Sequence, residues 1–149
     1  MQMTAAIRNA LLEALTATDA PLDPAATFLG VGTAITQSGL NTQLSDITQA
    51  TGAMATRQAV TTWSNVFTLS NGTAYQNAPL KTFAPASASE AQTLTCWFIA
   101  DALTAGNLIA FGLINPPIPL PDENSSWSIV LRVTLDPNAQ WSAEITFDG

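Results

Sequence analysis

The chain has 149 residues and a formal net charge of −7, and only 10% of its residues are charged. Its four cations, Arg8, Arg57, Lys81 and Arg132, form no basic patch. Because contacts to phosphate supply much of the affinity for nucleic acids, we expect no direct binding of DNA or RNA. Histidine is absent, which excludes His-dependent triads, His-ligated zinc and imidazole acid–base chemistry. The sequence therefore predicts neither a cofactor nor a metal site, and it favours a non-enzymatic role.

The length suits one domain with one core. We expect a single domain over residues 1–149, made of an N-terminal helical arm at 1–20 and a β-sandwich at 27–149. The first residues lack the basic start and continuous apolar core of a signal peptide, and no apolar run reaches the length of a membrane span. We therefore expect synthesis in the cytoplasm and no membrane partner. Cys96 is the only cysteine, and its place in an apolar run favours a buried, inert thiol.

One helix is predicted near the N-terminus. Ile7, Leu11 and Leu15 recur at i, i+4 and i+8 among good helix formers, which predicts an amphipathic α-helix over residues 4–17. Thr4 is a suitable N-cap. The short, Ala-rich apolar face fits packing either on the chain's own β domain or on a partner.

The rest of the chain predicts short strands separated by turns, at 27–33, 57–63, 66–69, 73–75, 80–83, 94–100, 108–114, 127–135 and 141–147. Asn71-Gly72 is a turn signal. The polar segment Ile35 to Ala53 is predicted to be a long surface loop, and Pro116 to Pro121 a stiff extended connection that cannot lie in a central strand. Because no helices are interleaved with the strands, we predict a mainly β fold, an antiparallel β-sandwich of jelly-roll type with a short N-terminal α-helix.

The segment from Gln92 to Ile114 predicts a β-hairpin that is apolar on both faces. Strict alternation places Leu94, Cys96, Phe98 and Ala100 on one face and Thr93, Thr95, Trp97 and Ile99 on the other. We therefore expect central strands that are covered on both sides, by a second sheet or by another subunit. Phe98 and Phe111 are predicted core anchors, and Asp101 and Gly106 are predicted turn residues.

Two groups of side chains contain the residue types of known chemical sites. The carboxylates could supply a glycosidase pair or a calcium site, but their spacing supports neither: Glu13, Asp19, Asp23, Asp46, Asp122 and Glu123. The tryptophans could form a sugar-stacking platform, although tryptophan on a strand is more often core or interface: Trp63, Trp97, Trp127 and Trp141. We predict no catalytic residue.

The order of these segments resembles a known group of proteins. The chain has the strand Thr27-Phe28-Leu29-Gly30-Val31-Gly32, then Arg57-Gln58-Ala59-Val60-Thr61, Ser70-Asn71-Gly72-Thr73-Ala74, and Trp97-Phe98-Ile99-Ala100-Asp101-Ala102 with Gly106-Asn107-Leu108. Over roughly residues 4 to 135, this is similar to small tailed-bacteriophage virion proteins, variously described as capsid cement or decoration proteins and as tail-fibre proteins. Two features depart from that pattern: Pro116 to Ser126 replaces a glycine-containing turn, and Trp141 to Phe147 extends past the usual end.

The resemblance implies a virion structural protein. We expect a capsid cement or decoration protein, made in the host cytoplasm, that binds the outside of the assembled shell and stabilises it without catalysis. The expected partners are the major capsid protein and other copies of the chain in a homotrimer, since cement proteins of this kind tend to be trimers and the charge-poor surface favours self-association. The predicted contact segments are Met1 to Ala17, Ile35 to Ala53 and Pro116 to Pro121. The alternatives are a tail-fibre or carbohydrate-binding β-sandwich module of the virion.

Overall fold

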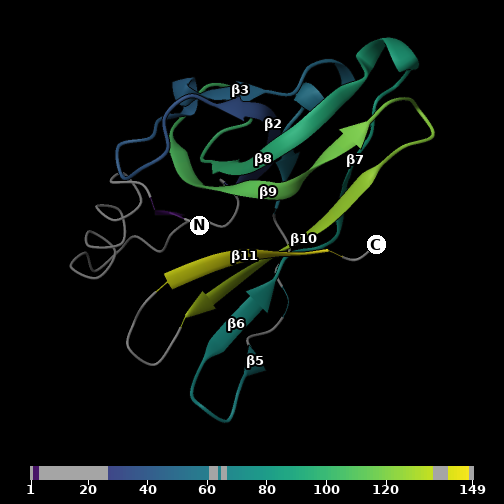
Figure 1. Cartoon of the computed structure of the whole chain (residues 1–149). Helices are drawn as coiled ribbons and strands as arrows, with labels where there is room; N and C mark the ends of the chain where they lie inside the picture. The colour runs from purple at the N-terminus through teal and green to yellow at the C-terminus, as the bar shows by residue number, and fades with distance from the viewer. Residues whose placement is uncertain (1, 4–26, 61–63, 65–66, 136–140, 148–149) are drawn as a thin grey trace.

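A computed structural model shows that the chain is mainly β, with two antiparallel sheets (Figure 1). The structure describes residues 2–3, 27–60, 64, 67–135 and 141–147. Within these residues the only helices are three short 3-10 turns, η2 (Leu44–Asp46), η3 (Gly52–Ala55) and η4 (Ala88–Glu90). None of them is long or apolar enough to cross a membrane. The predicted helix at 4–17 lies outside the described residues.

Each sheet has a main path of paired strands and one side branch. Sheet A has the order β1 (Gln2–Met3), β9 (Leu108–Leu120), β8 (Gln92–Ala100), β2 (Phe28–Ile35) and β3 (Ile47–Gln49), with β4 (Gln58–Ala59) paired to β2. Sheet B has the order β11 (Trp141–Phe147), β10 (Trp127–Leu135), β6 (Ala74–Asn77) and β5 (Phe67–Thr68), with β7 (Lys81–Phe83) paired to β10. The predicted antiparallel β architecture is confirmed, whereas this strand order does not show the jelly-roll connectivity.

The β8–β9 hairpin is the centre of sheet A, as the sequence predicted. Its two faces are not those of strict alternation, because the register shifts between Leu94 and Cys96. Residues 114–117 of β9 lie opposite Thr95 alone, since Leu94 pairs with Ile118 and Cys96 with Leu113. At this bulge, Leu94 packs in the core that contains Trp97 and not in the core that contains Cys96. The predicted position of Leu94 was therefore wrong.

The larger core lies between the two sheets. It combines side chains of sheet A with side chains of β7 and β10 in sheet B, chiefly Leu29, Val31, Leu94, Trp97, Ile99, Phe83, Trp127, Ile129 and Leu131. In β10 the alternation predicted from the sequence is confirmed for the described side chains, because Trp127, Ile129 and Leu131 are buried and the residues between them are not. Burial of this apolar area is the main force that holds the two sheets together.

A second core lies on the other face of sheet A. Phe98 and Phe111 are its largest side chains, with 1% and 2% of their surfaces exposed, and Cys96, Ile47 and Leu108 surround them. Phe98 lies across its strand partner Gly30, where a Cβ would overlap with the phenyl ring. The predictions that Phe98 and Phe111 are core anchors and that the hairpin is covered on both faces are confirmed.

The segment Ile35 to Ala53 is not the predicted surface loop. It contains β3, which pairs with β2, and it buries Thr42, Ile47 and Ala50. The Thr42 hydroxyl donates to Gln37 O (3.0 Å) and accepts the N–H of Gly39 (2.8 Å), so its polar group is satisfied inside a turn. A strand of three residues is too short to produce a periodic signal, which explains the error.

The prolines from Pro116 to Pro119 belong to strand β9. Thr93 pairs with Pro119 and Gln92 with Leu120, so β8 lies on one side, and no described strand pairs with this part of β9 on the other. Proline has no N–H to donate, and an open sheet edge tolerates it. The extended conformation was predicted correctly, but the assignment to a connection outside the sheet was wrong.

The remaining predicted strands are confirmed, β10 and β11 with the predicted ends and most of the others with changed ends. β2, β7, β10 and β11 lie within or close to their predicted ranges. The hairpin of β5 and β6 turns at Asn71-Gly72, where the N–H of Thr73 donates to Asn71 Oδ1 (3.0 Å). The strand predicted at 57–63 is reduced to β4, and residues 61–63 lie outside the described part of the chain.

Candidate interaction surface

Arg57 is a buried cation that ties the loop between β8 and β9 to the domain. It directly precedes β4, and 4% of its surface is exposed. Its Nη1 donates to the carbonyl oxygens of Ala102 (2.6 Å) and Ala105 (2.7 Å), and its Nη2 donates to Gln49 Oε1 (3.3 Å). Its Cζ lies 5.4 Å from the centre of the Phe98 ring, a cation–π distance. Arg57 therefore fixes the loop against the second core.

Asp101 begins the same loop and has the turn role that the sequence predicted. Its carboxylate accepts the backbone N–H of Asn107 (2.6 Å) and the Asn107 side-chain amide (2.9 Å). Gly106 has φ +81°, a conformation that glycine adopts without steric penalty. Burial lowers the pKa of Arg57, and the charge of Asp101 acts in the opposite direction. These contacts make the loop rigid and give no indication of catalysis.

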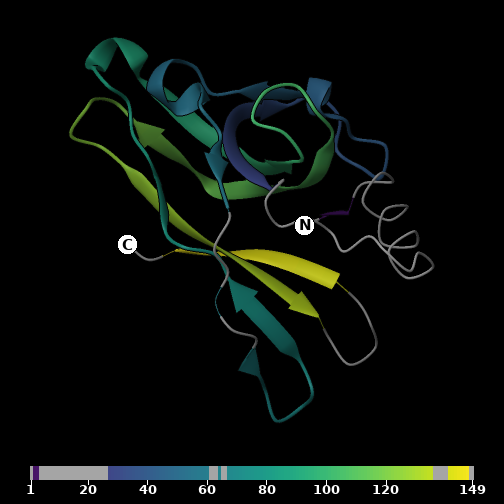
Figure 2. The same cartoon turned by 180° about the vertical axis from the view of Figure 1, so that it is seen from behind.

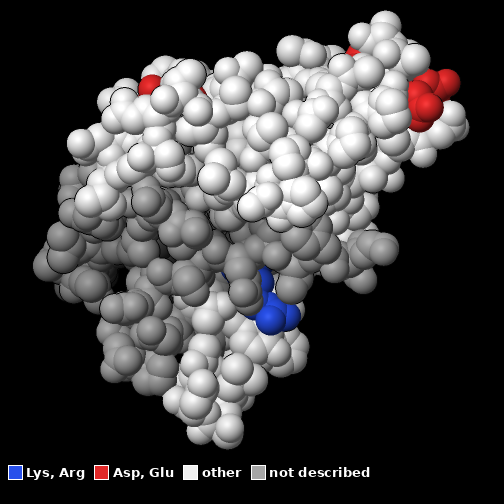
Figure 3. Space-filling model, in the orientation of Figure 1, with Lys and Arg blue, Asp and Glu red and all other residues white. Residues whose placement is uncertain are grey.

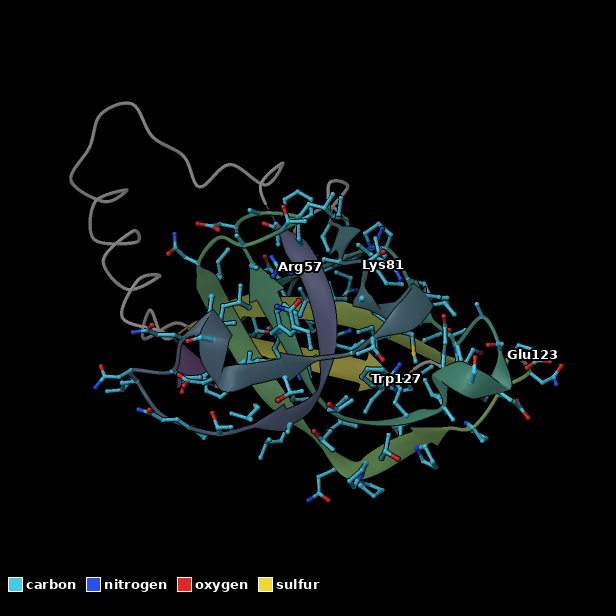
Figure 4. The ribbon with its side chains drawn as sticks, turned by 90° about the horizontal axis from the view of Figure 1, so that it is seen from above. Arg57, Lys81, Glu123 and Trp127 are labelled. Atoms are coloured by element: carbon cyan, nitrogen blue, oxygen red, sulfur yellow. The ribbon has the colours of Figure 1, made fainter. Side chains whose placement is uncertain are left out.

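The described carboxylates form no chemical site. Within the described residues, no group of three His, Cys, Asp or Glu side chains could hold a metal ion. Asp46 accepts the N–H of Gln43 (2.8 Å), and Asp122 accepts that of Asn124 (3.0 Å), so both stabilise turns. Glu123 points outward at one end of the molecule, far from Arg57 (Figure 4). Glu13, Asp19 and Asp23 lie outside the described residues.

Sequence reasoning did not single out Glu90, a carboxylate that bridges two segments. It accepts the backbone N–H groups of Ala53 (3.0 Å) and Ala86 (2.9 Å), and these bonds lower its pKa. Both hydrogen bonds lie at the surface. They hold two loops together locally and do not indicate a binding site.

Two tryptophans are in the core and cannot form a sugar platform. Trp97 and Trp127 are buried between the sheets, which confirms the prediction for this pair. Trp63 and the side chain of Trp141 lie outside the described part.

Cys96 is buried, as the sequence predicted. Burial raises the pKa of the thiol to about 11 from an ordinary value of 9.0. Because the thiolate is the reactive form, iodoacetamide at pH 8 should modify Cys96 about 100-fold more slowly in the folded than in the urea-unfolded protein. Mass spectrometry measures both alkylation rates, and equal rates would show an accessible thiol.

The raised pKa of Cys96 also makes the stability of the fold depend on pH. The contribution of the neutral, buried thiol to stability is fully present below pH 9, and it is lost as the pH rises toward 11.

The clearest exposed feature is a row of three side chains on sheet B, here called the aromatic row: Phe67, Tyr75 and Arg132. Phe67 and Tyr75 are register partners whose rings stack with centres 5.2 Å apart and planes 21° apart. Arg132 Cζ lies 4.4 Å from the centre of the Tyr75 ring, and its Nε donates to Asn77 Oδ1 (2.9 Å). Since its neighbour Leu131 is buried in the core between the sheets, Arg132 is on the opposite face of sheet B.

The aromatic row lies next to a further exposed apolar side chain, that of Leu69, which directly precedes the turn of the hairpin. Phe67 is 47% exposed, and Leu69, two residues further along, is 49% exposed. Figures 1 and 2 show that the hairpin of β5 and β6 extends away from sheet A. On the face drawn in Figure 3 the described surface is mostly uncharged, with a few acidic groups along its upper edge and one basic patch in its lower half. Exposed aromatic and aliphatic side chains on a charge-poor surface are typical of an interaction site.

Sequence reasoning missed the aromatic row. Phe67 pairs with Tyr75 in a register centred on Asn71. A two-residue Asn71-Gly72 turn would have placed Phe67 opposite Gln76, so the turn signal alone did not indicate this pair. The role of Arg132 could not be found in this way, because its strand comes much later in the chain.

One comparison with known proteins identifies a family. A family model described as podophage GP4 fiber I protein gp80 matches residues 2–122. The matched range begins at β1 and ends just after β9, so it contains all of sheet A. No curated protein matches the chain.

This match favours one of the alternatives that the sequence left open. The predicted virion structural role is confirmed, and the tail-fibre alternative is better supported than capsid decoration, for which the family gives no support. A fibre family is structural, in agreement with the prediction that the chain is not an enzyme. Because the match covers most of the chain, the protein belongs to the podophage GP4 fiber I protein gp80 family and is a structural fibre protein of a phage virion.

Proposed function

We propose that the protein is a self-associating subunit of the tail fibre, a homotrimer in which the aromatic row and Leu69 form contacts between copies. The observation that carries this proposal is the exposure of Phe67 and Leu69 on the hairpin of β5 and β6. Phe67 and Leu69 gain little from the folding of a single copy, because about half of each side chain stays in water. They gain more when a second copy covers them.

The composition of the aromatic row supports a protein partner. Tyrosine, phenylalanine and arginine are enriched in interfaces, and a few such residues carry most of the binding energy. Arg132 is held over Tyr75 and bonded to Asn77, so its side chain loses little conformational freedom on association. The low charge of the surface reduces the cost of removing water from it.

The double variant F67S/L69S tests this proposal. Loss of two apolar contacts per interface should weaken self-association by about 10-fold or more. Light scattering during size-exclusion chromatography should give a trimer for the native protein and mainly monomer for the variant at micromolar concentration. The control is L40S/L103S, in which two exposed leucines of other loops are changed and the trimer should remain. Circular dichroism checks that both variants are folded.

Two outcomes would overturn the proposal. A native protein that is a monomer at high concentration would exclude the trimer, and a folded F67S/L69S variant that keeps the native mass would exclude the aromatic row as the contact. The predicted contact with the major capsid protein stays a prediction, which the location of the protein in virions tests.

A second candidate function is glycan binding at the same row. The half-exposed Phe67 ring lies in a row with polar groups of Arg132 and Asn77, and a ring face beside hydrogen-bonding groups suits a sugar. A glycan array with the native protein and the F67A variant separates this function from self-association. Glycan binding predicts array signals for the native protein that are lost in F67A, whereas self-association alone predicts no array signal for either protein.

A further inference from the structure

We infer that strand β1 is exchanged between copies, so that Gln2–Met3 of one subunit pairs with β9 of its neighbour in the fibre. This inference rests on the self-association proposed above. In the single chain, Gln2 pairs with Phe111 and Met3 with Ala110 in antiparallel register. The same pairs can form between two copies, because both copies carry the identical strand and the identical edge.

The acceptor is one specific place on the edge of sheet A. Ala110 and Phe111 belong to the well-packed part of β9, with β8 on the other side and both side chains buried. This part of β9 presents backbone hydrogen-bonding groups that need a partner on the side of β1. If β1 leaves, the edge is open and can accept another strand.

The rest of the same edge is unsuited to pairing. Pro116, Pro117 and Pro119 lack a backbone N–H, and the bulge at residues 114–117 bends the strand. An incoming strand therefore has a defined register at residues 110–111 and little opportunity to slip along β9. Such blunted edges restrict where another chain can add.

The link between β1 and the rest of sheet A is long enough for exchange. Residues 4–27 separate β1 from β2, and with the helix predicted over residues 4–17 this length of chain spans at most roughly 55 Å. Exchange replaces a pairing within one chain by the same pairing between chains, so it adds no unfavourable contact. Once copies are held together in a fibre, the effective concentration of the neighbour's β1 is high, and this further favours the pairing between chains.

The occupant that fits best is the N-terminus of a second copy and not an unrelated peptide. β1 is the strand whose backbone register on this edge the structure shows. The family match starts at residue 2 and ends at residue 122, so it contains both the donor strand and the acceptor strand. Donor and acceptor are different surfaces, which makes the contact head-to-tail, as a closed trimer or an open fibre requires.

Disulfide trapping tests the exchange. A tagged M3C variant and an untagged A110C variant are mixed, unfolded together, refolded and oxidised with oxidised glutathione. Residues 3 and 110 are register partners, and cross-strand partners lie within the distance that a disulfide spans. Exchange predicts a cross-linked species with the sum of both masses on non-reducing gels, and up to about half of the M3C chains should form it because neighbours are mixed at random.

The controls separate the register from chance collision. M3C mixed with L113C should give at least 10-fold less product, although Leu113 is 67% exposed and lies on the same strand. The native protein should give none, because its single thiol, Cys96, is buried. The double variant M3C/A110C should produce a ladder of dimers and larger species.

The outcomes distinguish this inference from the proposed function. A double variant that is trimeric by light scattering but yields only monomers with an internal disulfide would overturn the exchange and leave self-association intact. A monomeric native protein without any cross-linked product would overturn both. Equal products for A110C and L113C would also overturn the exchange, because they would show collision without a defined register.

Discussion

Replacing Phe98 with alanine is expected to lower the free energy of unfolding by about 3–5 kcal/mol. Phe98 is 1% exposed, lies across Gly30, and supports the buried guanidinium of Arg57. Its ring lies over Gly30 of the neighbouring strand, and glycine has no side chain that could fill this place. The variant therefore loses the burial of the ring and leaves a cavity in the second core.

Urea denaturation followed by tryptophan fluorescence measures this loss. The matched control is L113A, on the same hairpin, whose side chain is 67% exposed and whose truncation should change stability by no more than about 0.5 kcal/mol. A loss below about 1 kcal/mol for F98A would show that the second core can close over the missing ring, contrary to the packing described here.

Replacing Arg57 with methionine is expected to lower the free energy of unfolding by about 3 kcal/mol, because two charge-assisted hydrogen bonds to the loop between β8 and β9 are lost. Ala102 O and Ala105 O then depend on water. Methionine retains an unbranched apolar side chain, so the change removes the polar contacts more than the packing. Arg57→Lys should recover less than half of the loss, since an ammonium lacks the planar fork that reaches both carbonyls.

Hydrogen exchange locates the effect of the Arg57 variants. The N–H of Asn107, which donates to Asp101, should exchange at least 10-fold faster in R57M because the loop loses its second attachment. The amides of β10 should exchange faster only to the extent that global stability falls. An R57M protein with native stability and unchanged exchange at Asn107 would contradict the proposed role of Arg57.

The sequence predicted the strands whose side chains show a clear period. Trp127, Ile129 and Leu131 are buried at alternate positions of β10, and the ends of that strand were predicted to the residue. The same alternation misplaced Leu94, because a bulge depends on the register between two strands and has no signal within one. The prolines of β9 were assigned outside the sheet, because a sequence does not reveal which part of a strand is an edge.

The candidate surface was less predictable than the fold. Arg57 contacts carbonyl groups 45 and 48 residues later in the chain, and Arg132 lies 55 residues from Asn77. No local pattern indicates such contacts. Of the three predicted contact segments, Ile35 to Ala53 is partly core, Pro116 to Pro121 lies mainly in a strand, and Met1 to Ala17 is described only at β1. The choice between capsid and fibre came from the family match, because both roles require the same kind of charge-poor surface.

Antibody labelling of intact phage particles, viewed by electron microscopy, tests the central claim most directly. Gold-conjugated antibodies raised against the purified protein should bind at the fibres of the tail, and particles that lack the protein should remain unlabelled. Label distributed over the capsid shell, with none on the fibres, would contradict the assignment and would restore the capsid decoration role that the sequence alone favoured.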